Sequence, residues 1–133
     1  MNPPDLIFST PFHIEMWVLE SEDKLGSITT EMVVHQTVAF GFLQHRLTSL
    51  SFTYEDFDRF HLDLNRLLNR TIHQATLSDM DQRFVLCFQA PTAELRVVGS
   101  AQQVNLQLKL TAESNLNAAK ACLEKLNHFP KWW

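Results

Sequence analysis

An alternation of apolar and polar residues in the last third of the chain constrains the fold most strongly. Every second residue from Val104 to Leu110 is apolar, whereas every second residue from Asn105 to Thr111 is polar. Successive side chains of a β-strand point to opposite faces, so this period of two predicts a strand with one buried face. Apolar residues then recur at helical spacing, which predicts a C-terminal helix over about residues 114–127.

Two strand-like stretches are predicted in the first third of the chain. Residues 12–19 alternate and predict a first strand, and a turn is expected over 21–26. A long β-like stretch then runs from Ile28 to Phe42, in which the even-numbered residues share one mainly apolar face. Gly41 is expected to mark a bulge or a close backbone approach. Leu50 and Phe52 end a further short strand.

The second half of the chain returns to strands. The segment 83–89 is apolar on both faces, which predicts a central strand covered on both sides. The links between the strands are short, and this favours antiparallel hairpins over parallel crossovers. The predicted strands are 72–77, 83–89, 94–98 and 103–111, with a turn over 78–82.

A central helix is predicted over about residues 54–69. Thr53 and Asp56 have the spacing of an N-terminal capping box, with Asp in place of the usual Glu or Gln. An apolar stripe at helical spacing follows it, and the opposite side is charged, which predicts a solvated face with Glu55–Arg59 and Arg59–Asp63 ion pairs. The stripe consists of Tyr54, Phe57, Phe60, His61, Leu64, Leu67 and Leu68, while Leu62 falls on the polar side.

Together these elements predict one α+β domain over residues 1–133. Its sheets are expected to be twisted and mainly antiparallel, with the central helix over 54–69 and the C-terminal helix over 114–127. Three prolines near the N-terminus, Pro3, Pro4 and Pro11, disfavour regular structure, so residues 1–11 are expected to form a leading arm. No internal repeat is evident in the sequence.

The charge and the ends of the chain exclude some classes of partner. The formal net charge of −4 argues against a surface that neutralises nucleic-acid phosphates. The N-terminus lacks the basic start and long apolar core of a signal peptide, and no apolar run has the length to span a bilayer. The chain is therefore expected to be cytoplasmic, without membrane contact. Cys87 and Cys122 have no metal or redox spacing and are expected to be free thiols.

Catalytic and metal-binding motifs are missing from the sequence. The six histidines form no H-x-x-x-H or H-E-x-x-H pair, the serines form no nucleophile elbow, and the three glycines form no phosphate loop. We therefore predict a protein that is not an enzyme, with no catalytic, cofactor-binding or metal-binding residues and no cofactor. A histidine site assembled across the fold stays open, because spacing along the chain cannot test it.

Partner-binding residues are predicted from two residue types. Tryptophan is enriched at interface hot spots, and acidic side chains in turns suit a basic partner. The alternatives are that the tryptophans pack onto the sheet and that the acidic residues are scattered over a solvated surface. The predicted partner-binding residues are Trp17, Glu20, Glu22, Asp23, Asp79, Asp81, Trp132 and Trp133, and Glu31 is a further acidic candidate.

The order of elements resembles that of the WapI-type immunity proteins of bacterial polymorphic toxin systems. The resemblance covers roughly residues 54–130, is one of pattern, and lacks a diagnostic motif from which functional residues could be transferred. It implies a non-catalytic inhibitor that binds a cognate toxin in the cytosol and occludes it. The expected partner is then a protein, in the form of a basic toxin domain. The residues that carry the resemblance are Phe57–Leu68, Arg83–Phe88, Glu94–Gly99, Val104–Leu110 and Leu116–Pro130.

Two other readings remain. A small-molecule-binding or enzymatic domain would have a pocket in a sheet concavity, lined by Phe40, Phe42, Phe84 or Phe88 with a polar group such as His35 or His61. A structural or adaptor subunit would form a homodimer or a hetero-oligomer through an exposed strand edge or the terminal tryptophans.

Overall fold

The chain builds one structural unit twice, four antiparallel strands followed by a helix. The computed structural model describes residues 2–89, 92–101, 104–113 and 116–129, without the side chains of 38, 99–108 and 113. The first unit consists of β1 (Leu6–Phe8), β2 (His13–Glu22), β3 (Ser27–Val38), β4 (Gly41–Thr53) and α1 (Tyr54–Leu68). The second consists of β5 (Gln74–Ser78), β6 (Phe84–Gln89), β7 (Thr92–Ala101), β8 (Val104–Glu113) and α2 (Leu116–Asn127).

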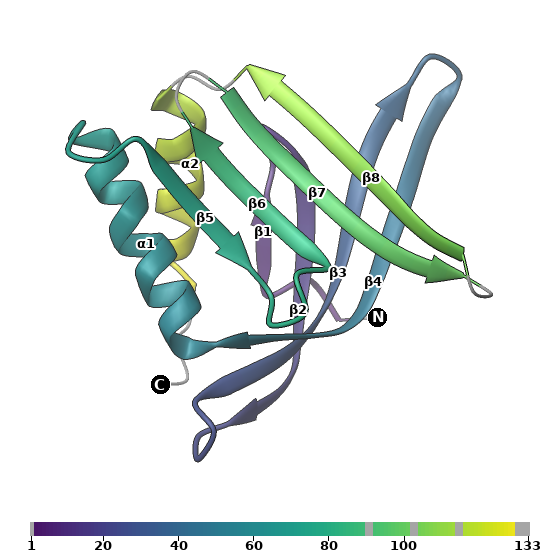
Figure 1. The fold of residues 1–133 in the computed structure, drawn as a ribbon, viewed down its shortest axis with the longest axis horizontal. Helices are drawn as coiled ribbons and strands as arrows, with labels where there is room; N and C mark the ends of the chain where they lie inside the picture. The colour runs from purple at the N-terminus through teal and green to yellow at the C-terminus, as the bar shows by residue number, and fades with distance from the viewer. Residues whose placement is uncertain (1, 90–91, 102–103, 114–115, 130–133) are drawn as a thin grey trace.

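Each unit forms its own sheet, with the strands in sequence order. Sheet A has the order β1-β2-β3-β4 and sheet B the order β5-β6-β7-β8, and all neighbouring strands are antiparallel. Figure 1 shows sheet B in front of sheet A, with both helices along one side. The predicted α+β class, the antiparallel sheets and the two helices are thus confirmed.

The helices connect the two units, because each helix packs against a strand of the other unit. α1 follows β4 but contacts β5, and α2 follows β8 but contacts β1; the two helices also contact each other. Figure 1 shows α1 beside β5. One hydrophobic cluster therefore contains side chains from both sheets and both helices. Phe52 of β4, for example, packs against Phe57 of α1 and Phe84 of β6.

Part of the predicted leading arm is a strand. Leu6–Phe8 forms β1 and pairs with β2, and Leu6 and Phe8 are buried. Asp5 fixes the approach to this strand, because its carboxylate accepts a hydrogen bond from the Val18 N–H at 2.7 Å. The prolines at 3, 4 and 11 flank the three paired residues, so they leave the backbone hydrogen bonds of β1 intact.

The long stretch from Ile28 to Phe42 is a hairpin and does not have one continuous face. β3 ends at Val38, which pairs with Gly41 across the two residues 39–40. The chain reversal changes the parity of the alternation, so Phe42 lies opposite Thr37 and on the face away from the core. Gly41 has φ +144°, a conformation that residues with a side chain rarely adopt, and this allows the tight reversal.

Two strand predictions from the second half have different outcomes. Strand β6 lies between β5 and β7 as predicted, but it is fully covered on one face only. Phe84, Leu86 and Phe88 are buried, whereas Val85 and Cys87 are half-buried. The strand predicted over 103–111 is confirmed as β8. Within it Leu110 is half-buried and Lys109 and Thr111 are exposed.

Candidate functional site

The outer face of sheet A, which points away from the hydrophobic core, carries an unusual group of polar side chains. In β2, Ile14 and Met16 point into the core, so the residues between them project outward. The register then places His13 opposite His35, Glu15 opposite Val33 and Trp17 opposite Glu31.

His13, Glu15 and His35 converge into what we call the His–Glu–His cluster. His13 Nε2 lies 3.2 Å from Glu15 Oε1, in hydrogen-bond geometry, and His35 Nε2 lies 2.8 Å from the same oxygen. The two imidazole rings meet edge to face, with centroids 4.6 Å apart. One ligand-type atom from each residue falls within 4.8 Å of the other two. This geometry is suitable for holding a cation with nitrogen and oxygen ligands.

Other side chains surround the cluster on the outer face of sheet A. Gln44 of β4 approaches His35, with its Nε2 3.5 Å from the ring Nδ1. Val33 lies next to Glu15 in the register and is 3 % exposed although it is on the outer face. Glu31 and Arg46 form an ion pair farther along the same face. The cluster thus belongs to a layer of side chains that covers the outside of sheet A.

Trp17 lies on this outer face but also has a structural contact. Its indole N–H donates a hydrogen bond to the Asn2 carbonyl at 2.9 Å, and its side chain is half-buried. Part of the ring therefore holds the segment before β1. The other predicted tryptophans, Trp132 and Trp133, lie outside the described residues.

The end of the β3–β4 hairpin exposes three large apolar side chains, which we call the hairpin tip. Phe40 is 95 % exposed, Phe42 66 % and Leu43 49 %. Figure 1 shows this end of the hairpin standing away from the neighbouring strands. The sequence pattern assigned Phe40 and Phe42 to an apolar sheet face and did not reveal this exposure, since it read the even positions across the turn as one strand.

Three of the predicted acidic residues gather at the opposite end of sheet A, at and beside the β2–β3 turn. Glu20 and Asp23 are exposed and Glu22 is half-buried. The Tyr54 hydroxyl donates to Asp23 Oδ1 at 2.8 Å. The Ser21 hydroxyl lowers the pKa of Tyr54, while desolvation and the Asp23 carboxylate raise it, and the net pKa is raised. Because the β2–β3 turn and the hairpin tip are at opposite ends of sheet A, these acidic residues lie away from the hairpin tip.

Asp79, one of the predicted partner-binding residues, is buried in the turn between β5 and β6. It is 3 % exposed, and its carboxylate accepts hydrogen bonds from the Phe84 N–H at 2.9 Å and the Asp81 N–H at 3.3 Å. The carboxylate stabilises the turn between β5 and β6, because buried backbone donors need partners. Its burial argues against the predicted partner-binding role, whereas Asp81 is exposed.

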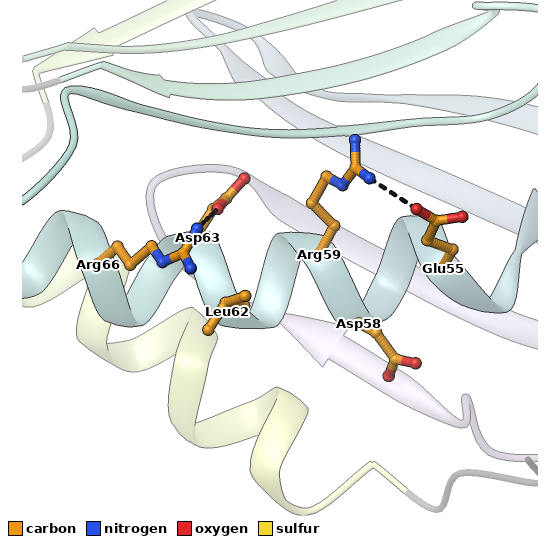
Figure 2. A pocket seen from close by; sticks show the side chains of 6 residues that line it. All are labelled: Glu55, Asp58, Arg59, Leu62, Asp63 and Arg66. Atoms are coloured by element: carbon orange, nitrogen blue, oxygen red, sulfur yellow. Dashed lines mark hydrogen bonds and ion pairs between the residues drawn. The ribbon is translucent and has the colours of Figure 1, made fainter.

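The outward face of α1 borders an open groove of about 560 Å³. Figure 2 shows Arg59 directed toward Glu55 and Arg66 toward Asp63. The ion-pair distances are 2.6 Å for Glu55–Arg59 and 3.8 Å for Asp63–Arg66. The first pair matches the prediction, while Asp63 pairs one turn onward instead of with Arg59. Leu62 also lines the groove and is 47 % exposed.

The residues of the predicted ligand pocket are spread over separate parts of the fold. Phe84 and Phe88 are buried in the core, and Phe40 and Phe42 are exposed at the hairpin tip. His61 of α1 lies with its Nε2 2.6 Å from Asn127 Oδ1, so its ring ties the two helices together. The buried pair, Phe84 and Phe88, and the exposed pair, Phe40 and Phe42, therefore do not line one common cavity.

The His–Glu–His cluster was missed because its members come from two strands. His13 and Glu15 are two residues apart, a spacing that places both on one strand face. The position of His35 depends on the register of β3 against β2, which the sequence does not reveal.

Within the described residues, neither helix is long and apolar enough to cross a membrane. No family model, curated protein or solved structure matches the chain.

Proposed function

We propose that this chain is a non-catalytic binding protein that inserts its hairpin tip into an apolar cleft of a partner protein. The observation that carries the proposal is the exposure of Phe40 and Phe42, at 95 % and 66 %. Exposed apolar side chains that cluster mark interaction surfaces more often than those that are scattered singly. A rigid aromatic side chain in a partner's pocket is a typical interface anchor.

The backbone beside the tip supports the same proposal. β4 is an edge strand of sheet A, so its outer N–H and C=O groups near the tip have no strand beside them within the described part of the sheet. Farther along β4, the carbonyls of Thr48 and Ser51 already accept hydrogen bonds, from Arg83 and from the Met80 N–H. Such an edge can pair with a strand of another protein. A partner that contacts this hairpin would therefore gain apolar burial at the tip and backbone hydrogen bonds along β4.

The partner class that we propose is a toxic protein domain with a basic surface. The resemblance to the WapI-type immunity proteins supports an inhibitor that covers its target's active site in the bacterial cytosol. The net charge of −4 and the acidic side chains at Glu20, Asp23 and Asp81 would attract a basic partner over long range. The charge would raise the association rate, while the hairpin tip would hold the complex.

Co-expression with the product of the neighbouring gene tests the proposal. We expect a stable complex and rescue of growth by the native chain. The double substitution Phe40→Ser and Phe42→Ser should weaken the complex by about 30-fold or more, because each ring would act as a hot spot. Leu62→Ser is the matched control, since Leu62 is also exposed but lies on α1. It should leave rescue and affinity unchanged.

Other outcomes would contradict the proposal in separable ways. Full rescue by the Phe40→Ser, Phe42→Ser variant would show that the hairpin tip is not part of the interface. If the product of the neighbouring gene is not toxic and forms no complex with this chain, the proposed immunity function is wrong. Sedimentation of the chain alone covers the adaptor alternative: a homodimer that this double substitution converts to a monomer would assign the tip to self-association.

A further inference from the structure

We propose that His13, Glu15 and His35 form a binding site for a divalent transition-metal ion, with Zn²⁺ as the ion to test. The site lies on the outer face of sheet A, between β2 and β3, and is independent of the proposed inhibitory function. Two imidazole nitrogens and one carboxylate oxygen form a ligand set that zinc sites in proteins commonly use.

Two of the three distances between the ligand atoms are close to those that a zinc ion requires. Tetrahedral coordination with metal–ligand bonds of about 2.0–2.1 Å separates the ligands by about 3.3 Å. Glu15 Oε1 already lies 3.2 Å from His13 Nε2 and 2.8 Å from His35 Nε2. All three ligand atoms fall within 4.8 Å of one another. A small rotation of the His13 ring, which is the most exposed of the three side chains, completes the geometry.

His35 contributes a nitrogen that lacks a hydrogen bond. Its Nε2 is buried, and no described group forms a hydrogen bond with it, although Glu15 Oε1 is only 2.8 Å away. The contact is therefore close without having hydrogen-bond alignment. A buried polar atom in this state costs free energy. A metal ion placed between His35 and Glu15 would satisfy the nitrogen and neutralise the carboxylate.

Gln44 is positioned to orient the His35 ring through its other nitrogen, Nδ1. Metal-binding histidines usually donate the proton of their other ring nitrogen to a nearby acceptor, which leaves a lone pair for the metal. The side-chain amide of Gln44 faces His35 Nδ1 at 3.5 Å. Rotating this amide by a half-turn presents its carbonyl oxygen, which accepts the Nδ1 proton and leaves the Nε2 lone pair directed at the site.

The strands hold the three ligands on a firm base. His13 and His35 are directly opposed in the β2–β3 register. The residues next to them, Ile14 and Val34, are 2 % and 0 % exposed and anchor both strands in the core. A site built on packed strands loses little conformational entropy when the metal binds. Three protein ligands also leave a fourth position for water or for a group from another molecule.

Calorimetric titration of the full-length chain, purified without a histidine tag and stripped with a chelator, tests the site. We expect one Zn²⁺ per chain and no heat of binding with Mg²⁺, which prefers oxygen ligands. His13→Gln and His35→Gln should each weaken Zn²⁺ binding at least about tenfold. His73→Gln is the matched control, because His73 is exposed and lies outside the cluster. It should bind Zn²⁺ as the native chain does.

Two further measurements separate metal binding from an effect on folding. Zn²⁺ should raise the Tm of the native chain and leave that of the folded His13→Gln, His35→Gln double variant unchanged. Co²⁺ in place of Zn²⁺ should give the visible absorption of a four-coordinate ion in the native chain. The proposal is overturned if the double variant binds Zn²⁺ as tightly as the native chain. It is equally overturned if His73→Gln weakens binding as much as His35→Gln does.

Discussion

Three buried polar side chains of this protein, Thr30, Asp79 and Cys122, each have a specific backbone partner. The Thr30 hydroxyl donates to the Leu50 carbonyl at 3.2 Å, and the Asp79 carboxylate accepts two backbone N–H groups. The Cys122 thiol donates to the Thr10 carbonyl at 3.1 Å. These bonds offset the loss of water at each group, so most of these residues act in folding and not in recognition.

Burial of Cys122 should make stability fall at high pH. Desolvation raises the pKa of its thiol from 9.0 to about 12. Above pH 9 the unfolded chain loses this proton while the folded chain retains it, so the free energy of unfolding decreases. The loss should approach about 1.4 kcal/mol per pH unit, or roughly 2 kcal/mol between about pH 8 and pH 10.5. Urea unfolding at both pH values measures it.

Substitution of each cysteine assigns this pH effect. Cys122→Ala should show a smaller decrease between the two pH values by about the same 2 kcal/mol. Cys87→Ala retains Cys122, so it should show the full decrease of the native chain. An equal decrease in all three proteins would mean that Cys122 ionises as easily when folded as when unfolded.

At the scale of elements, a reciprocal pair of hydrogen bonds between Thr53 and Asp56 stabilises the start of α1, and the sequence predicts this pair. Thr53 Oγ1 accepts from the Asp56 N–H at 3.0 Å, and the Asp56 carboxylate accepts from the Thr53 N–H at 2.9 Å. The capping box predicted from these two residues is confirmed. Its reciprocal bonds satisfy donors that the first turn of a helix leaves free.

Removing the Thr53 hydroxyl should therefore weaken α1. Thr53→Ala should lower the free energy of unfolding by about 1 kcal/mol, since the Asp56 N–H loses its acceptor. Thr53→Ser keeps the hydroxyl and should cost much less. Chemical denaturation of the three proteins measures the difference. Equal losses for Ala and Ser would show that the methyl group, and not the cap, is responsible.

The β3–β4 hairpin shows how a correct local pattern can mislead at the same scale. Strand periodicity from Ile28 to Phe42 was real, but it belonged to two strands of opposite direction. The reversal at residues 39–40 moved Phe42 to the outer face, opposite Thr37. A glycine at position 41 was the available signal, because it permits φ +144° next to the turn.

At the scale of the whole molecule, the two four-strand units are coupled by their helices. α2 packs against β1 of the first unit, and α1 packs against β5 of the second. Each sheet therefore buries its apolar face partly against the helix of the other unit. Leu126 of α2 is 5 % exposed and belongs to the shared hydrophobic cluster. We expect the two units to unfold together, since loss of one helix exposes apolar side chains of both sheets.

Hydrogen exchange on a core variant tests this coupling. Leu126→Ala should destabilise the protein by about 2–5 kcal/mol. The slowest amides of β3 and of β6 should then exchange faster by the same factor, because both would exchange through global unfolding. Glu124→Ala, on the exposed side of α2, should leave both rates nearly unchanged. Faster exchange confined to one sheet would show that the units unfold separately.

The sequence by itself determined the local structure of this protein. Periods of two and 3.6 residues predicted most strands and both helices, and Thr53 with Asp56 predicted where α1 begins, because backbone and side-chain preferences act over a few neighbouring residues. Tertiary structure alone decided which strands pair and in which register. The β2–β3 register brings His35 to His13 and Glu15. The packing of the elements leaves Phe40 and Phe42 exposed and Asp79 buried. Contacts between residues distant in the chain depend on the energy of the whole core, which no local pattern contains.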